Sequence, residues 1–240
     1  MDKKSFTQHI SQQYNEELED ILNQVMTMGG LVEQQLSDAL VALIEGDNER
    51  GEHVVTNDYR VNAIEVELDE ACTHILARRQ PAASDLRLIM AVIKTITDLE
   101  RIGDEAERIG RMALHLLDSD RRRSPMAAVE SLGQHVRGML RGALDSFARM
   151  DTAQAVRVAQ EDIQADSQYE VIMRELMQYM QDYPKSVPRV MDVVWSVRAL
   201  ERIGDRARNI CEYVVYFVRG KDVRHTSFEQ MAQEATGDRH

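Results

Sequence analysis

The sequence DLERIGDEAERI at residues 98–109 returns 101 residues later as ALERIGDRARNI at residues 199–210. Both copies keep apolar residues at the spacings of three and four that are typical of one helix face. The similarity extends to both sides, because the apolar stripe from Leu86 to Leu116 matches the stripe from Val187 to Phe217 at the same offset. Self-similarity of this kind indicates an internal repeat, and it decides the architecture before any local feature does.

Upstream of these stripes the matching offset becomes 104 residues. Asp47 and Asp151 occupy matching positions in two short turns, where an aspartate is expected to cap the helix that follows. Prolines in the later turns mark the start of a third helix in each half. The six expected helices span residues 5–45, 48–78, 83–117, 126–149, 152–181 and 186–219.

Long helices that carry one apolar stripe need antiparallel partners. The sequence therefore predicts an all-α fold of two tandem, repeat-related three-helix bundles built from six long helices. Only 12 Gly and 4 Pro occur in 240 residues, which favours such uninterrupted elements. Gly29 and Gly30 interrupt the first helix and indicate either a kink or a close helix contact. The expected divisions are a first bundle at 1–118, a linker at 119–125, a second bundle at 126–220 and a polar, frayed tail at 221–240.

The charge of the chain limits its partners. There are 41 acidic residues against 29 Lys and Arg, for a net charge of −12, and such a protein repels phosphate backbones and anionic lipids. We expect no nucleic-acid partner, and membrane association only through other proteins. Cys72 and Cys211 lie far apart within helical patterns, which favours free thiols in a reducing cytoplasm.

Acidic residues stand at or beside the core-facing stripes. On the last helix of each half, two carboxylates lie one turn apart: Glu100 with Asp104, and Glu201 with Asp205. On the second helix, two more oxygen-bearing side chains share a face: Asp58 with Asn62, and Asp162 with Asp166. Gly103 and Gly204 lie inside the acidic motifs and indicate either close backbone access or ordinary tight packing.

Two interpretations of these acids stay open. They can be ordinary surface groups neutralised by nearby arginines, namely Arg101, Arg108, Arg202, Arg206 and Arg208. Alternatively, carboxylates on a packed seam cost free energy unless they are paired or bound to a cation, and here that cost recurs in both halves. All-oxygen ligands favour hard cations such as magnesium, manganese or calcium, and a carboxylate-rich cluster also suits iron.

Motifs for other chemistry are missing from the sequence. It contains no phosphate-cradling P-loop, no H-E-x-x-H and no G-x-S-x-G. Two alternatives to a metal-binding regulator remain: a metal-dependent hydrolase or oxidase of the helical-bundle type, and a purely structural bundle with ion-paired seams.

Several segments together resemble the PhoU family over residues 6–225. They are VMTMGGLVEQQLSDAL at 25–40, EVELDEACTHILARRQPAASDLRLIM at 65–90, and the two LERIGD copies at 99–109 and 200–210. The resemblance implies a non-enzymatic cytoplasmic adaptor that represses the bacterial phosphate-starvation (Pho) response. Such an adaptor acts between the Pst phosphate transporter, chiefly its ATPase PstB, and the sensor kinase PhoR, so that the regulator PhoB stays unphosphorylated and phosphate uptake is modulated. The resemblance also implies a homodimer and a metal cluster on each bundle.

The family motif Glu-or-Asp-x-x-x-Asp matches two pairs here, Glu100 with Asp104 and Glu201 with Asp205. The accompanying acids match Asp58 and Asp162, followed by Asn62 and Asp166. The cofactor implied is a divalent or trivalent metal, either magnesium, manganese or iron. Because Asn62 is neutral, the first bundle is expected to be the less fully occupied. Ala148 and Arg149 form a candidate partner contact at a helix end, and the alternative for them is plain hairpin packing.

Overall fold

The computed structural model describes residues 12–116 and 125–237, and in these ranges the chain is helical and contains no strand. The long helices are α1 (Gln12–Glu45), α2 (Asn48–Asn57), α3 (Tyr59–Arg79), α4 (Ala83–His115), α6 (Met126–Arg149), α7 (Thr152–Asp182) and α8 (Val187–Arg219). A 3₁₀ turn, η1 (Pro184–Ser186), and a short helix, α9 (Phe228–Thr236), complete them. The predicted all-α class is confirmed. Residues 5–11 of the first predicted helix and 119–124 of the predicted linker lie outside the described ranges.

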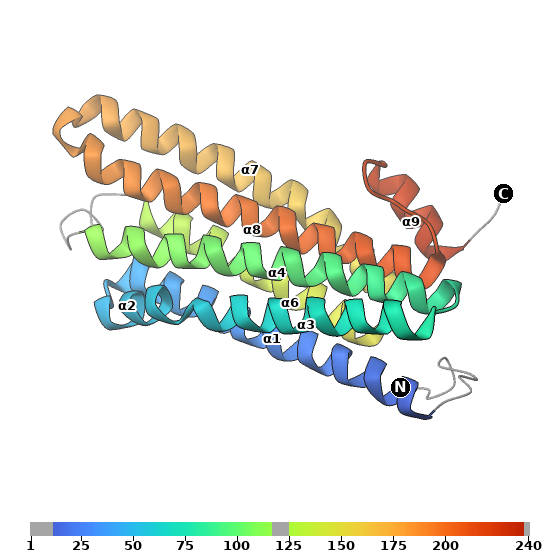
Figure 1. Ribbon diagram of the computed structural model, residues 1–240. Helices are drawn as coiled ribbons and strands as arrows, with labels where there is room; N and C mark the ends of the chain where they lie inside the picture. The colour runs from blue at the N-terminus through green and yellow to red at the C-terminus, as the bar shows by residue number, and fades with distance from the viewer. Residues whose placement is uncertain (1–11, 117–124, 238–240) are drawn as a thin grey trace.

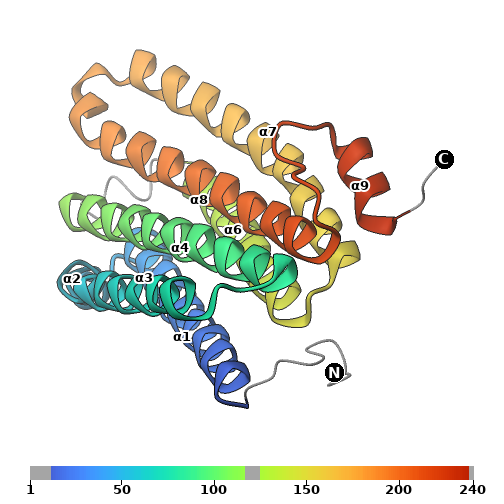
Figure 2. The ribbon, with the colours of Figure 1, turned by 45° about the vertical axis from the view of Figure 1, so that its right-hand side comes forward.

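Four helices, α1, α4, α6 and α8, form the centre of the molecule (Figure 1). Helix α4 packs on α8 and α1 packs on α6, and these contacts join the two halves. Helix α3 lies against α1 and α4 on one side, whereas α7 lies against α6 and α8 on the other, as the turned view also shows (Figure 2). Each half is thus a three-helix bundle, as predicted, and the two bundles lie side by side in one elongated body. None of the described helices combines the length and apolarity needed to cross a bilayer.

The apolar stripes supply the core. Leu99 and Ile102 of α4 are fully buried, and so are Leu200 and Ile203 at the matching positions of α8. The first members of the predicted stripes are instead exposed, at 42% for Leu86 and 36% for Val187. Both lie in the first turn of their helix, near an end of the bundle, where fewer neighbouring side chains cover them. The predicted caps are confirmed, because Asp47 and Asp151 each accept a hydrogen bond from a backbone N–H three residues later.

The second predicted helix, 48–78, is divided at Asp58, so the prediction of one continuous helix is wrong there. Asp58 keeps helical dihedral angles, with φ −58° and ψ −34°, and the chain continues in the same direction. Its carbonyl accepts a short 2.9 Å bond from the Val61 N–H and only a long 3.5 Å bond from the Asn62 N–H. The backbone hydrogen bonding therefore tightens at Asp58, whose side chain faces α1 and α4. In the second half, α7 runs without a break.

The C-terminal tail was expected to fray, and this prediction is wrong. Helix α9 begins with a capping box formed by Ser227 and Gln230, and its side chains Met231 and Ala235 are buried. The Ala235 carbonyl accepts hydrogen bonds from the Thr152 hydroxyl at 3.1 Å and from the Arg219 guanidinium at 2.8 Å. The polar composition of residues 221–240 concealed this short amphipathic helix.

Helices α1 and α6 meet through a reciprocal contact. A Cβ atom at Gly29 would lie 2.5 Å from Leu144 Cδ2, and a Cβ atom at Gly133 would likewise overlap Leu40 Cδ2. Gly133 and Leu144 match Gly29 and Leu40 at the 104-residue offset, so the contact is self-complementary about a pseudo-twofold axis and the helices run antiparallel. Of the two predicted roles for Gly29, the close helix contact is the one observed.

Candidate functional site

The site in the first half of the chain centres on Asp58, which is only 8% exposed. Its carboxylate accepts a hydrogen bond from Gln35 Nε2 of α1 at 3.1 Å and another from Asn62 Nδ2 at 3.3 Å. Gly103 of α4 makes room for this arrangement, because a Cβ atom there would lie 3.2 Å from Asp58 Oδ1. The amides of α1 and α3 hold the carboxylate against the backbone of α4.

The carboxylates at the α2–α3 junction, on α3 and on α4 repel one another. Burial raises the pKa of Asp58, and the negative charges of Asp104 and Glu107 raise it further. Burial also raises the pKa of Glu100, with added repulsion from Asp104 and Glu65. Burial is again the main reason that the pKa of Asp104 is raised. A proton or a cation would relieve this repulsion.

Gln35 adds an unsatisfied oxygen to this face. The residue is 6% exposed, and its Oε1 atom has no hydrogen-bond partner within the described residues. That oxygen lies 3.4 Å from the position of a Cβ atom at Gly103, on the Asp58 side of α4. A buried hydrogen-bond acceptor without a partner costs about 1 to 3 kcal/mol. The Gln35 oxygen is therefore available to coordinate a cation beside the carboxylates.

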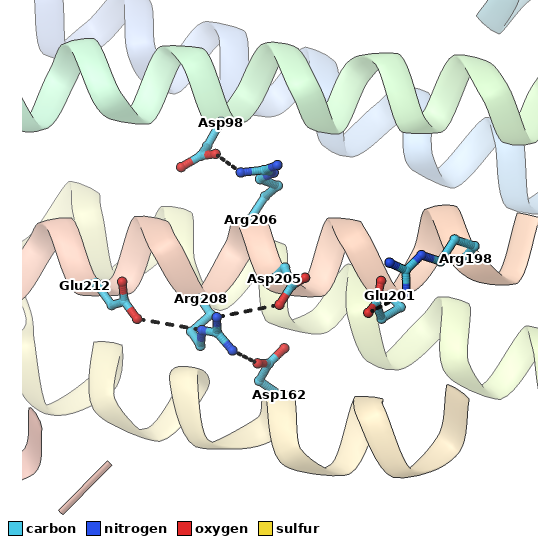
Figure 3. A network of polar contacts seen from close by, with 8 residues as sticks. All are labelled: Asp98, Asp162, Arg198, Glu201, Asp205, Arg206, Arg208 and Glu212. Atoms are coloured by element: carbon cyan, nitrogen blue, oxygen red, sulfur yellow. Dashed lines mark hydrogen bonds and ion pairs between the residues drawn. The ribbon is translucent and has the colours of Figure 1, made fainter. Parts of the chain in front are cut away.

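In the second half, Arg208 lies among the acids (Figure 3). Its Nη1 donates to Asp162 Oδ2 on α7, and its Nη2 lies 3.6 Å from Asp205 Oδ1. Its Nε lies 3.6 Å from Glu212 Oε1, one turn further along α8. Asp162 is only 2% exposed. One guanidinium thus joins three carboxylates across the α7–α8 seam.

Glu201 and Asp166 complete the second face. Arg198 donates to Glu201 Oε1 at 3.0 Å, whereas Glu201 Oε2 is buried without a hydrogen-bond partner in the described part of the chain. Burial raises the pKa of Glu201, although the Arg198 charge opposes this. Asp166 is exposed, and partial desolvation, followed by repulsion from Asp205, raises its pKa.

The structure brings the predicted residues onto two faces: Asp58, Asn62, Glu100 and Asp104 between α2, α3 and α4, and Asp162, Asp166, Glu201 and Asp205 between α7 and α8. In residues 12–116 and 125–237, no three Asp, Glu, His or Cys side chains are grouped closely enough to hold a metal ion as they stand. Metal binding at these residues stays a prediction.

The arginines near the acidic motifs have different partners. Arg208 neutralises acids of the candidate site, as the surface-group interpretation expects. Arg202 instead donates to Glu105 at 2.8 Å, and Arg206 donates to Asp98 at 3.2 Å, so both tie α8 to α4. Figure 3 shows the Arg206–Asp98 pair on the side of α8 that faces away from Arg208.

Gln35 and Glu107 are among the participants that the sequence pattern did not single out. Gln35 carried a usable signal, because it interrupts the apolar stripe of α1 where Met139 continues the stripe in the second half. Glu107 matches Arg208 at the 101-residue offset, and a comparison of charges at matching positions would have revealed that reversal. Both signals depend on aligning the halves residue by residue.

The predicted partner contact lies at the end of α6. Phe147 is buried in the core, Ala148 is half-buried and Arg149 is exposed. Met150 ends the helix with a left-handed φ of 55°. The hairpin packing of Phe147 is thus observed, and partner binding by Ala148 and Arg149 stays a prediction.

Comparison with known proteins identifies the family. A family model described as PhoU domain matches residues 25–113 and again residues 129–214. The chain belongs to the PhoU family. One PhoU-family relative, the phosphate-specific transport system accessory protein PhoU homolog of Pseudomonas putida, is 49% identical over 237 residues, or 99% of this chain and 93% of the relative. The Escherichia coli K12 accessory protein PhoU is 48% identical, covering 99% of this chain and 98% of the relative.

Solved structures of the PhoU family have the same fold. The crystal structure of PhoU from Pseudomonas aeruginosa superposes with a TM-score of 0.83 at 47% identity, covering 87% of this chain and all of that one. PhoU from Streptococcus pneumoniae, a phosphate transport system regulatory protein, gives a TM-score of 0.82 at 29% identity over 88% and 99% of the chains. The PhoU-family assignment thus rests on sequence and structure together.

Glu212 gives the site a measurable pH dependence. Burial raises its pKa to about 7, with repulsion from Asp222 adding to the rise and Arg208 opposing it. A folded-state pKa above the unfolded value stabilises the protein at low pH, and this contribution is lost as pH rises from about 4.5 to about 7. We expect the metal-free protein to lose on the order of 1 to 3 kcal/mol of unfolding free energy between pH 5.5 and pH 8.

Urea unfolding at the two pH values measures this loss. Glu212→Gln is expected to flatten the pH dependence, and the same change at the exposed Glu234 is expected to leave it unchanged. Equal slopes in the Glu212 variant and the parent protein would contradict the assignment.

Proposed function

We propose that this chain is a non-enzymatic cytoplasmic adaptor that represses the phosphate-starvation response. It couples the Pst phosphate transporter, through PstB, to the sensor kinase PhoR, and it works as a homodimer. The observation that carries the proposal is the match of nearly the whole chain, at 48 to 49% identity, to relatives named as accessory proteins of the phosphate-specific transport system. The net charge of −12 supports protein partners and opposes direct contact with anionic lipids.

A bound cation forms part of the proposal. In the first half the donor chemistry fits a hard cation, because Asp58, Glu100 and Asp104 supply carboxylates and Gln35 supplies a buried, unpartnered oxygen. When bound, the cation supplies positive charge that offsets the repulsion among these carboxylates. Asp58 would then hold the α2–α3 junction against α4, and Gln35 would tie α1 to the same point.

Deletion of the gene tests the regulatory role. We expect alkaline phosphatase to be expressed constitutively in medium with abundant phosphate, because the signal that represses PhoR would be lost. The measurement is phosphatase activity in the deletion strain, the parent and a complemented strain. Normal repression in the deletion strain would overturn the proposal.

Capture of the purified full chain by membranes that contain Pst and PhoR tests the partners directly. The proposal expects binding to PstB or PhoR in the absence of substrate turnover. Metal-dependent turnover by the purified protein, with no binding to either membrane protein, would favour the hydrolase or oxidase alternative instead.

A further inference from the structure

The two acidic faces differ at matching positions. On α4, Glu107 precedes Arg111 by one turn, and the two form an ion pair. On α8 the order of charges is reversed, with Arg208 preceding Glu212. Arg111 therefore lies seven residues, or about two turns, beyond Asp104, whereas Arg208 lies three residues from Asp205 and reaches Asp162.

We propose that Arg208 is a resident counter-ion that takes the place of a metal ion in the second bundle, so that the chain binds its cation at the first bundle alone. The inference rests on the metal-binding part of the proposed function and corrects its symmetry. It also reverses the expectation drawn from Asn62, under which the first bundle would be the less occupied.

The contacts of Asp162 support the absence of a second cation. Asp162 is 2% exposed, and a buried carboxylate requires a partner of opposite charge. Arg208 already supplies that charge and also approaches Asp205 and Glu212, so a metal ion would first have to displace a guanidinium that touches three carboxylates. Asp58, at the matching position, has two amides as hydrogen-bond partners.

The side chains that α1 and α6 place beside the two acidic faces also differ in a way that favours a cation in the first half. Gln35 of α1 directs a buried, unpartnered oxygen toward the Asp58 face. The matching residue of α6 is Met139, whose Cε lies 3.8 Å from the position of a Cβ atom at Gly204. A thioether is a poor ligand for a hard cation. The first bundle thus has one more hard donor, and within the described residues no arginine forms an ion pair with its candidate ligands Asp58, Glu100 and Asp104.

Manganese binding to the purified full chain tests the inference. Equilibrium dialysis, with electron paramagnetic resonance to separate free from bound Mn²⁺, is expected to give about one ion per chain for the parent protein. Asp58→Asn is expected to abolish binding, and Arg208→Gln is expected to raise it about twofold by freeing Asp162 and Asp205. Arg174→Gln removes the same charge from an exposed position on α7 and is expected to leave the stoichiometry unchanged.

The charge-exchanged variant Arg208→Glu with Glu212→Arg covers the case in which Arg208→Gln fails to fold. It gives the second half the order of charges found at Glu107 and Arg111, keeps the net charge, and is also expected to double the bound manganese. Circular dichroism of each variant verifies that it is folded.

The outcomes separate the two proposals. Two ions in the parent protein, or one ion in both the parent and the folded Arg208 variants, would overturn the role of Arg208 and leave metal binding standing. No ion in the parent but one in the Arg208 variants would support Arg208 as counter-ion and overturn the first-bundle site. No ion in any folded variant would overturn both.

Discussion

Replacing Arg206 with alanine is expected to lower the free energy of unfolding by about 3 kcal/mol. Arg206 of α8 pairs with Asp98 of α4, whose side chain is only 4% exposed. The Asp98 carboxylate also accepts a 2.8 Å hydrogen bond from the Tyr213 hydroxyl, which cannot replace the lost charge. A buried carboxylate without its cation is the costly species, so the effect is far larger than that of a surface ion pair.

Urea unfolding measures the effect, and two variants control it. Arg174→Ala, at an exposed position, is expected to change stability by no more than about 0.5 kcal/mol. In an Asp98→Asn background the Arg206→Ala change is expected to cost much less, because no buried charge remains. A loss below about 1 kcal/mol in the single variant would show that the pair does not join α4 to α8 in the way described.

Replacing Gly133 with leucine is expected to cost about 3 kcal/mol or more, because even a Cβ atom at this position overlaps Leu40 of α1. A whole leucine side chain would force α1 and α6 apart and disturb the contact between the two bundles. The expected readout is a lower midpoint in thermal and urea unfolding.

The same helix provides a control, because a Cβ atom at Gly138 meets nothing within 4 Å. Gly138→Leu is expected to be neutral or stabilising by up to about 1 kcal/mol, since leucine is the better helix former. Adding Leu40→Gly to Gly133→Leu exchanges the partners and is expected to restore part of the loss. If Gly133→Leu and Gly138→Leu were equally stable, the tight α1–α6 contact would be refuted.

The sequence was sufficient to predict the helices because their signals are local. The apolar spacing around Leu99 and Leu200 and the caps at Asp47 and Asp151 depend only on neighbouring residues, and most predicted helix ends agree closely with the structure. The break at Asp58 could not be predicted, because it accompanies hydrogen bonds from another helix and from the next turn.

The sequence was sufficient to predict which acidic residues share a helix face, but it was not sufficient to predict which residues they contact. The spacing of Glu201 and Asp205 places them on one side of α8, but the spacing does not decide which neighbour each charge meets. Arg206 and Arg208 are two residues apart and therefore point in different directions, one toward α4 and the other toward α7. That distinction requires the arrangement of the helices around α8.

The pairing of Gly29 with Leu144, and of Leu40 with Gly133, has an evolutionary consequence. A self-complementary contact is the kind that joins identical subunits, since each surface binds its own copy. Two half-length chains with this surface would assemble as a symmetric dimer, and a duplication that fused their genes would keep the interface without inventing a new one. Within one chain the two halves can change separately, and the opposite charges at Glu107 and Arg208 are such a difference.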